Sequence, residues 1–95
     1  MSATTRSSDG LDARRKRLLF RCWHRGTKEM DYILGRFADA HIADLSEEEV
    51  ADFERLIELP DPDLYNAFND KASLDAAYAG GVFRRVKAFT GGPSA

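Results

Sequence analysis

Hydrophobic residues recur along most of the chain at the three- and four-residue spacing of an amphipathic helix, and no stretch of useful length alternates with the period of two that is typical of a strand. The clearest stripe is Met30, Ile33, Leu34 and Phe37, which fits positions i, i+3, i+4 and i+7 of one helix face. The pattern predicts an all-α fold, a compact bundle of about five short helices. The predicted helical segments lie at about 11–24, 30–41, 47–59, 62–69 and 73–89.

Several helix starts can be read directly from the sequence. Ser46 and Glu49 have the spacing of a capping box, in which each side chain bonds the other residue's backbone amide. Asp61 is predicted to cap the fourth segment, with Pro62 at its first helical position, and Ser73 to cap the fifth. Gly80-Gly81 lies within that fifth segment, where each glycine weakens a helix by about 1 kcal/mol, so we expect a kink or break there.

The length of 95 residues suits one domain, and 43% hydrophobic with 32% charged residues is a globular composition. We predict a single helical domain at residues 11–90 between disordered tails at 1–10 and 91–95. The N-terminal tail lacks the apolar core of a secretion signal, and no apolar run approaches the ~20 residues that a membrane span needs. One cysteine cannot form an internal disulfide, which suits a reducing compartment. We therefore predict a cytoplasmic protein that does not insert into a membrane.

The first two predicted helices meet at the segment from Arg25 to Glu29, which reads as a tight hinge. Gly26 supplies the backbone freedom for such a turn, either as the left-handed residue that closes the first helix or as the cap of the second. Glu29 then falls in the first turn of the second helix, where a carboxylate opposes the helix dipole favourably. Arg25 and Lys28 are left unexplained by helix formation, because cations at a helix N-terminus oppose the dipole. Gly35, inside the second helix, predicts a close contact with a neighbouring helix.

Charge is strongly separated along a chain whose net charge is only −2. Residues 14–28 contain seven Lys and Arg residues and no acid, whereas residues 39–63 contain ten acids and Arg55 alone among Lys and Arg. Such separation can orient a molecule against a partner, although a solvated helix face explains a basic run equally well. A nucleic-acid-binding domain would be more basic overall than the sequence pI of about 5.6.

Residue types that carry catalysis or bind metals are present but are not suitably spaced. Cys22, His24 and His41 do not form the four-ligand pattern of a structural zinc site. Cys22 and His24 are two positions apart, so on a helix they point to different faces and cannot act as a nucleophile and base pair. The paired glycines lack the strand-turn-helix context of a phosphate loop. We predict a non-catalytic protein without a metal site.

The hinge and its surroundings carry a combination of motifs. Arg25-Gly26-x-x-Glu29 follows the run 17–24 (Arg-Leu-Leu-Phe-Arg-Cys-Trp-His) and precedes Asp31 and Phe37. Leu45-Ser46 and the run 61–66 (Asp-Pro-Asp-Leu-Tyr-Asn) come later in the chain. In this order, over about three quarters of the chain, the sequence resembles the succinate dehydrogenase assembly (flavinylation) factors, whose signature is Arg-Gly-x-x-Glu between the first two helices. The family pattern often has a Trp at the position of Ala67, so here the chain departs from it.

This resemblance implies a helical bundle and an assembly factor that is not an enzyme. Its implied partner is the flavoprotein subunit of succinate dehydrogenase or of fumarate reductase, to a histidine of which FAD becomes covalently attached. FAD would be handled by that flavoprotein, and no cofactor would be bound tightly by this chain. Trp23 is expected either in the core or, because Leu18, Leu19 and Cys22 already fill the buried stripe, as an exposed interface anchor. Tyr65 is expected to pack in the core. The implied partner-binding residues are Arg25, Gly26 and Glu29, with Trp23, Lys28 and Arg21 beside them.

Other functions stay open at this point. A small helical nucleic-acid-binding module or a regulatory protein-interaction module would also suit a basic helix on an all-α domain. Direct FAD binding by the basic helix is a weaker alternative, because no dinucleotide-binding fingerprint accompanies it. We predict a monomer, with a dimer through the apolar stripes as the alternative.

Overall fold

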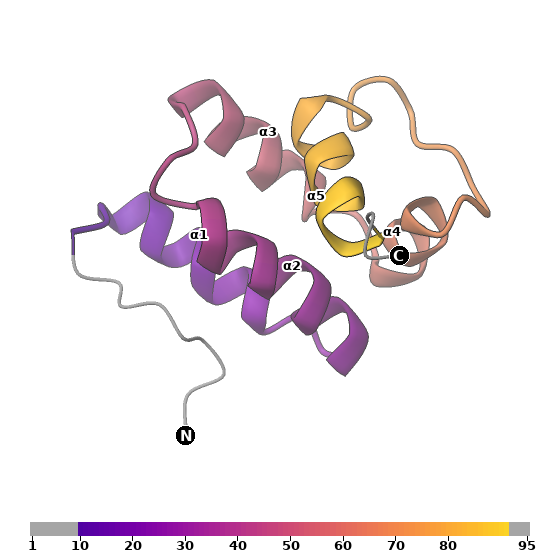
Figure 1. The fold of residues 1–95 in the computed structure, drawn as a ribbon, viewed down its shortest axis with the longest axis horizontal. Coiled ribbons are helices and arrows are strands. Elements are labelled where there is room, and N and C mark those ends of the chain that lie inside the picture. Colours follow the sequence, from indigo (N-terminus) through magenta and orange to yellow (C-terminus); the bar gives the residue numbers. More distant parts are fainter. Residues whose placement is uncertain (1–9, 92–95) are drawn as a thin grey trace.

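The computed structural model describes residues 10–91, which form five helices and, within that range, no strand (Figure 1). This confirms the predicted all-α bundle. The helices are α1 (Ala13–Trp23), α2 (Lys28–His41), α3 (Glu47–Leu56), α4 (Asp61–Phe68) and α5 (Gly81–Gly91). The predicted tails fall mostly at 1–9 and 92–95, outside the described residues. Gly10 lies in a turn, and α5 extends to Gly91.

The bundle is organised around α2. Figure 1 shows α1 and α2 side by side, with α5 crossing between α2 and α3 and with α4 beyond it. Phe37 of α2 meets Phe53 of α3 edge to face, with ring centroids 5.6 Å apart, and Phe89 of α5 at 5.7 Å. Every helix contributes to one core, whose fully buried members include Leu18, Cys22, Met30, Leu34, Phe37, Val50, Phe53, Leu64, Val82 and Val86.

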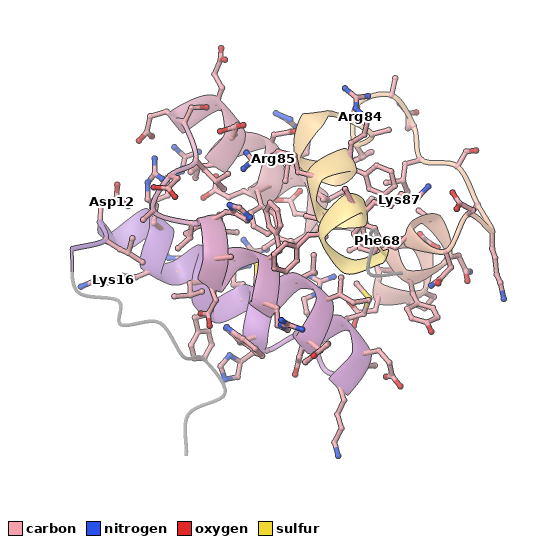
Figure 2. The ribbon with its side chains drawn as sticks, viewed as in Figure 1. Asp12, Lys16, Phe68, Arg84, Arg85 and Lys87 are labelled. Atoms are coloured by element: carbon pink, nitrogen blue, oxygen red, sulfur yellow. The ribbon has the colours of Figure 1, made fainter. Side chains whose placement is uncertain are left out.

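Polar side chains define where the first three helices begin. Asp12 accepts a hydrogen bond from the Arg15 amide at 2.8 Å and so caps α1 (Figure 2). The predicted capping box of α3 is confirmed, because the Glu49 amide donates to Ser46 Oγ at 3.1 Å and the Ser46 amide donates to Glu49 Oε1 at 2.8 Å. These bonds satisfy amides that have no partner inside the helix.

The fourth helix differs from its prediction at the start. Pro60, rather than Asp61, is the N-cap, and no side chain caps this helix. The Asp61 carboxylate is directed elsewhere, as described below, so it cannot fold back onto its own helix. Leu64 and Phe68 face the core.

The fifth segment is helical only in its second half. Ser73 caps no helix, because α5 begins at Gly81, and the predicted break at Gly80-Gly81 is confirmed. Before it, the Asp75 carbonyl accepts from the amides of Tyr78 at 2.8 Å and Ala79 at 3.1 Å, which forms a separate turn. Leu74 and Tyr78 of this segment still pack against the core, which explains why their spacing looked helical.

The predicted close contact at Gly35 is confirmed. Gly35 is buried on α2 and faces the Trp23 ring at the end of α1. A β-carbon added at Gly35 would stand 2.5 Å from Trp23 Cε2 and 2.6 Å from Cε3, closer than any real side chain could approach. The glycine therefore allows α1 and α2 to pack closely around an indole.

Candidate functional site

The α1–α2 corner, residues 24–29, is the hinge expected from the sequence. Thr27 caps α2, since its hydroxyl accepts from the Met30 amide at 3.3 Å, so the alternative in which Gly26 is the cap is wrong. Gly26 instead has φ of +112°, a conformation that side-chain-bearing residues rarely adopt. It is exposed, and a β-carbon there would meet nothing within 4 Å, so the backbone angle rather than crowding requires a glycine.

Arg25 turns inward from this corner and joins it to the α3–α4 connection. Its Nε donates to Asp61 Oδ1 at 2.8 Å, its Nη2 donates to the Leu59 carbonyl at 2.7 Å, and its Nη1 donates to the Ile57 carbonyl. The carbonyls that follow a helix end lack helical partners, and a cation suits them, while a carboxylate suits the first turn of the next helix. The Arg25 guanidinium bonds the two carbonyls and the Asp61 carboxylate at once. The Arg25 amide also donates to Asp31 Oδ1 at 2.5 Å.

The expectation that Arg25 offers its charge to a partner is therefore wrong in its geometry. Its side chain is only 11% exposed, and its donors are used inside the chain. Sequence reasoning missed this because the acceptors lie 32 to 36 positions away, where local patterns carry no information. Arg25 is a positioning residue that holds the corner in place.

Trp23 is also less exposed than expected. Its ring is half-buried against Gly35 and the core, and its Nε1 lies 3.4 Å from Asp39 Oδ1. The expectation that Trp23 is an exposed anchor is thus wrong, because the close approach of α1 and α2 covers much of the indole. Arg21 and Lys28, by contrast, are exposed, and their side chains show no hydrogen bond or ion pair within residues 10–91. Their role in binding a partner stays a prediction.

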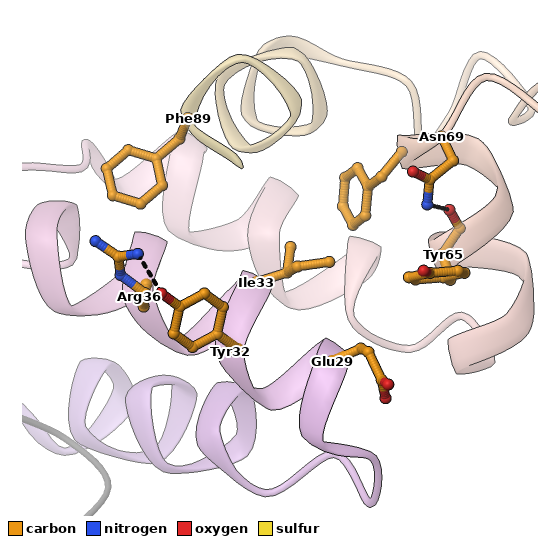
Figure 3. Close-up of a pocket in the computed structure, with 8 residues that line it drawn as sticks. Glu29, Tyr32, Ile33, Arg36, Tyr65, Asn69 and Phe89 are labelled. Atoms are coloured by element: carbon orange, nitrogen blue, oxygen red, sulfur yellow. Dashed lines mark hydrogen bonds between the residues drawn. The ribbon is translucent and has the colours of Figure 1, made fainter. Parts of the chain in front are cut away.

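Glu29 lies at the exposed edge of the corner and borders two hollows. It forms no hydrogen bond or ion pair with any residue that the structure describes. The larger hollow, which we call the α2–α4 groove, has a volume of about 470 Å³ and is shown in Figure 3. It is lined by Glu29, Tyr32, Ile33 and Arg36 of α2, Tyr65 and Phe68 of α4, Asn69 at the C-cap of α4, and Phe89 of α5.

The smaller hollow, the corner groove, has a volume of about 280 Å³ and lies against the start of α4. It is lined by Thr27, Glu29, Met30, Asp61, Pro62 and Tyr65. Glu29 and Tyr65 border both hollows, so they form the ridge between them. The predicted core position of Tyr65 is wrong, since 43% of the residue is exposed.

Three groove residues were not singled out from the sequence: Tyr32, Arg36 and Phe89. Arg36 Nη1 donates to Tyr32 Oη at 2.7 Å, and its guanidinium carbon lies 4.9 Å from the centre of the Tyr32 ring and 6.0 Å from that of Phe89. The sequence did contain a pattern that could have found them. Positions i, i+3, i+4 and i+7 of one helix face are occupied by Glu29, Tyr32, Ile33 and Arg36. This second stripe lies beside the buried one.

Part of the charge separation is neutralised inside the bundle. Arg14 of α1 binds Glu54 of α3, with Nη2 and Oε1 2.7 Å apart, and Arg15 reaches Glu47 at 3.1 Å. The hydrogen bond from Arg14 lowers the pKa of the Glu54 carboxyl, against the opposing effect of burial. The basic run therefore serves packing as well as any partner. Its exposed cations are Lys16, which projects from the bundle in Figure 2, with Arg17, Arg21 and Lys28.

Cys22 and the acidic residues do not form a reactive centre in the part of the chain that the structure covers. Burial raises the pKa of the Cys22 thiol, which keeps it protonated and unreactive. Between residues 10 and 91 no three His, Cys, Asp or Glu side chains are grouped so as to hold a metal ion. Over the same range no helix is long and apolar enough to cross a bilayer.

Comparisons with known proteins point to one family. Residues 16–90 match the family model described as flavinator of succinate dehydrogenase. The chain is 39% identical over 85 residues to the FAD assembly factor SdhE of Acetobacter pasteurianus, covering 90% of this chain and 78% of that protein. No solved structure matches it.

Mitochondrial proteins match over a smaller share of their length. Succinate dehydrogenase assembly factor 2 of Dictyostelium discoideum is 34% identical over 81% of this chain, and that of Danio rerio is 34% identical over 90%. The chain spans 55% of each of these two proteins. The resemblance drawn from the Arg-Gly-x-x-Glu motif is thus confirmed.

Proposed function

The chain belongs to the family of flavinators of succinate dehydrogenase, and from this premise we propose that it assists covalent attachment of FAD to the flavoprotein subunit by docking on that subunit through the α1–α2 corner. The same docking would serve the related subunit of fumarate reductase. FAD is handled by the flavoprotein, and the chemistry belongs to the flavin and its protein, so this chain acts as a non-catalytic assembly factor.

One observation carries the proposal. Glu29 has no hydrogen-bonding or ionic partner among residues 10–91, although it lies in the first turn of α2 and borders two hollows. A carboxylate in such a hollow gains strength as a hydrogen-bond acceptor when a partner excludes water. Glu29 is therefore the acceptor around which the docked partner is placed.

The other corner residues support Glu29 in different ways. Arg25 fixes the corner against the α3–α4 connection through its bonds to Ile57, Leu59 and Asp61, so the docking surface is preformed and loses little entropy on binding. Gly26 leaves the turn without a side chain, so a partner's backbone can approach it. Lys28, next to Glu29 in the sequence, and Arg21, in the last turn of α1, add positive charge that favours encounter with an acidic surface and is weakened by salt.

The test compares Glu29 with a matched acid. Glu29 and Glu48 are both exposed and are the second residues of α2 and α3. Affinity for the purified flavoprotein subunit is measured by calorimetry, and covalent flavin by its fluorescence in a denaturing gel. We expect Glu29→Ala to weaken binding at least tenfold and to slow flavin attachment, whereas Glu48→Ala does neither. A wild-type chain that fails to bind the flavoprotein overturns the proposal.

The exposed cations Lys16, Arg17 and Arg21 favour nucleic-acid binding as a second candidate. Retention on DNA that falls steeply with salt, without any flavoprotein binding, would support it over docking. A cytoplasmic location and a monomeric state stay predictions from the sequence.

A further inference from the structure

We propose that the α2–α4 groove selects a short extended segment of the flavoprotein subunit that carries a cationic side chain and a carboxylate about three residues apart. Glu29 binds the cation and Arg36 binds the carboxylate. The inference rests on the proposed function and adds to it a second charged contact and a rule for the sequence of the docked segment.

Arg36 is held ready for an anionic group. The Tyr32 hydroxyl accepts one of its N–H bonds at 2.7 Å, and the Tyr32 and Phe89 rings lie within 4.9 and 6.0 Å of its guanidinium carbon. No carboxylate pairs with Arg36 anywhere in residues 10–91, and the residue is exposed. Guanidinium groups bind carboxylates through two parallel hydrogen bonds, and aromatic neighbours that restrict the side chain reduce the entropy lost on binding.

The two charges lie at opposite ends of the groove, as Figure 3 shows. Seven helical positions separate Glu29 from Arg36, which places their backbones about 10 Å apart along α2 at 1.5 Å per residue. An extended segment advances about 3.3 Å per residue, so groups that meet these two charges stand about three residues apart. Because the charges are opposite, the segment can lie in only one direction.

The walls between the charges are apolar, and they limit what fits. Tyr32, Ile33, Phe68 and Phe89 line the floor and sides, with Tyr65 at the Glu29 end. A volume of about 470 Å³ is in the range of sites that enclose a drug-sized molecule, while a helix with side chains is about 10–12 Å wide. A short extended segment is therefore the occupant. A ligand with several phosphates would be repelled by Glu29 at one end.

The first experiment measures affinity for the purified flavoprotein subunit by calorimetry. Arg36→Ala and Arg36→Glu are compared with Arg84→Ala, which changes an exposed arginine on α5 that borders neither groove (Figure 2). Circular dichroism shows that each variant is folded, and Arg36→Lys keeps the charge without the planar fork. We expect about tenfold weaker binding for Arg36→Ala, a larger loss for Arg36→Glu, partial retention for Arg36→Lys and no change for Arg84→Ala. Tyr32→Phe, which keeps the ring but frees the guanidinium, should weaken binding about threefold.

A second experiment tests the direction of the segment. Hydrogen exchange on the complex identifies the flavoprotein segment that this chain protects, and its cation and carboxylate are then interchanged. We expect the interchanged flavoprotein to bind wild-type chain poorly and to regain affinity for the double variant Glu29→Lys with Arg36→Glu. The inference is overturned if the double variant does not restore binding to the interchanged flavoprotein. It is also overturned if the protected segment lacks the two charges.

The outcomes also separate this inference from the function on which it rests. Suppose that Glu29→Ala weakens binding while Arg36→Ala and Arg36→Glu leave it unchanged. The docking function then stands, and the proposal that the α2–α4 groove selects a segment with two charges is overturned. A wild-type chain that does not bind the flavoprotein overturns both. If FAD alone raises the melting temperature and Arg36→Ala abolishes that rise, the guanidinium holds a cofactor phosphate instead, and the inference is wrong.

Discussion

Arg25 and Asp61 form an ion pair across 36 positions of sequence, with Arg25 Nη2 and Asp61 Oδ1 2.8 Å apart. The two side chains are 11% and 17% exposed, so water screens the pair only weakly. This contact decides two features at once. It removes the capping carboxylate from α4, and it turns the Arg of the Arg-Gly-x-x-Glu motif inward, which leaves Glu29 as the charge of that motif that is open to a partner.

Arg25→Ala should destabilise the fold by about 2–3 kcal/mol. The change strands the Asp61 carboxylate and removes the donors from the Ile57 and Leu59 carbonyls, and hydrogen bonds to charged groups contribute about 1.5–3 kcal/mol each in net terms. Partial exposure keeps the loss below the 3–5 kcal/mol that is typical when one partner of a fully buried pair is removed. Urea unfolding followed by circular dichroism measures it. Arg25→Lys should recover only part of the loss, because an ammonium group cannot reach three acceptors as the planar guanidinium does.

An Arg25→Ala variant with wild-type stability and lost flavoprotein binding would contradict the inward role. In that case the guanidinium would leave Asp61 in solution and contact the partner directly.

Gly35→Ala should destabilise the protein by about 1–3 kcal/mol, even though alanine favours a helix by about 1 kcal/mol over glycine. The added carbon would overlap the Trp23 ring, so α1 and α2 must separate. The matched test is a double-mutant cycle with Trp23→Leu, measured by urea unfolding. Trp23→Leu alone should also destabilise the fold, because the half-buried indole packs on the core, but Gly35→Ala should cost much less in its presence. Equal costs of Gly35→Ala in both backgrounds would show that the indole is not the obstacle.

Acid should destabilise the contact between α1 and α3. The hydrogen bond from Arg14 holds the pKa of Glu54 below its ordinary value of 4.5, and the bond from the Ser46 amide does the same for Glu49. A carboxyl whose pKa is lower in the folded state contributes stability above the unfolded pKa, and this contribution is lost as pH falls through the folded pKa. The free energy of unfolding should therefore fall as pH drops below about 4.5.

Glutamine variants test this pH dependence without removing the contacts altogether. Glu49→Gln retains a side chain that can complete the capping box but loses the ion pair with Arg85, whose Nη1 lies 2.9 Å from Glu49 Oε2. Its stability at pH 7 should therefore fall only modestly, while its acid sensitivity decreases. Glu54→Gln should lose stability at pH 7, since Arg14 then keeps only its longer contact with Glu47 Oε1 at 3.3 Å, and should also depend less on pH. Unfolding curves at several values between pH 3 and 7 measure both effects, and wild-type pH slopes in both variants would contradict the assignment.

The features that the sequence predicted well are local ones. The Ser46–Glu49 capping box, the stripe of α2 and the break at Gly80-Gly81 each depend on residues within one or two helical turns, where spacing and propensity decide the structure. The segment 73–80 was wrongly predicted as helix, because two apolar residues that pack on the core from a turn, Leu74 and Tyr78, happen to follow helical spacing.

Contacts between distant segments explain what the sequence could not show. Arg25 was assigned to a partner because nothing nearby could use its charge, yet its acceptors follow α3 and begin α4. The sequence predicted the turn at the α1–α2 corner and the exposure of Glu29, Lys28 and Arg21, whereas the docking role of this corner stays a prediction. The α2–α4 groove depends on how α4 and α5 pack against α2, and that packing fixes which side of α2 stays open.

Tyr65 should contribute to flavoprotein binding without contributing much to stability. Its ring is 43% exposed and borders both hollows beside Glu29, and tyrosines that a partner covers are frequent hot spots of interfaces. Tyr65→Ala should weaken binding by at least tenfold, which corresponds to about 1.4 kcal/mol, while unfolding in urea changes little. Tyr65→Phe should retain most of the affinity if the ring face carries the contact. Calorimetry against the purified flavoprotein subunit gives both values.

Phe20 supplies the matched control for Tyr65. It is an aromatic residue on α1 that is 61% exposed, stacks on His24 with ring centroids 3.8 Å apart, and borders neither groove. Exposed aromatic rings promote nonspecific association, so the Phe20 variant measures how much affinity is lost for that reason alone. If Phe20→Ala weakens binding as much as Tyr65→Ala does, the α2–α4 side is not the docking face. Loss of binding by Tyr65→Ala with full binding by Phe20→Ala places the flavoprotein on the side of the bundle where Glu29 and Tyr65 meet.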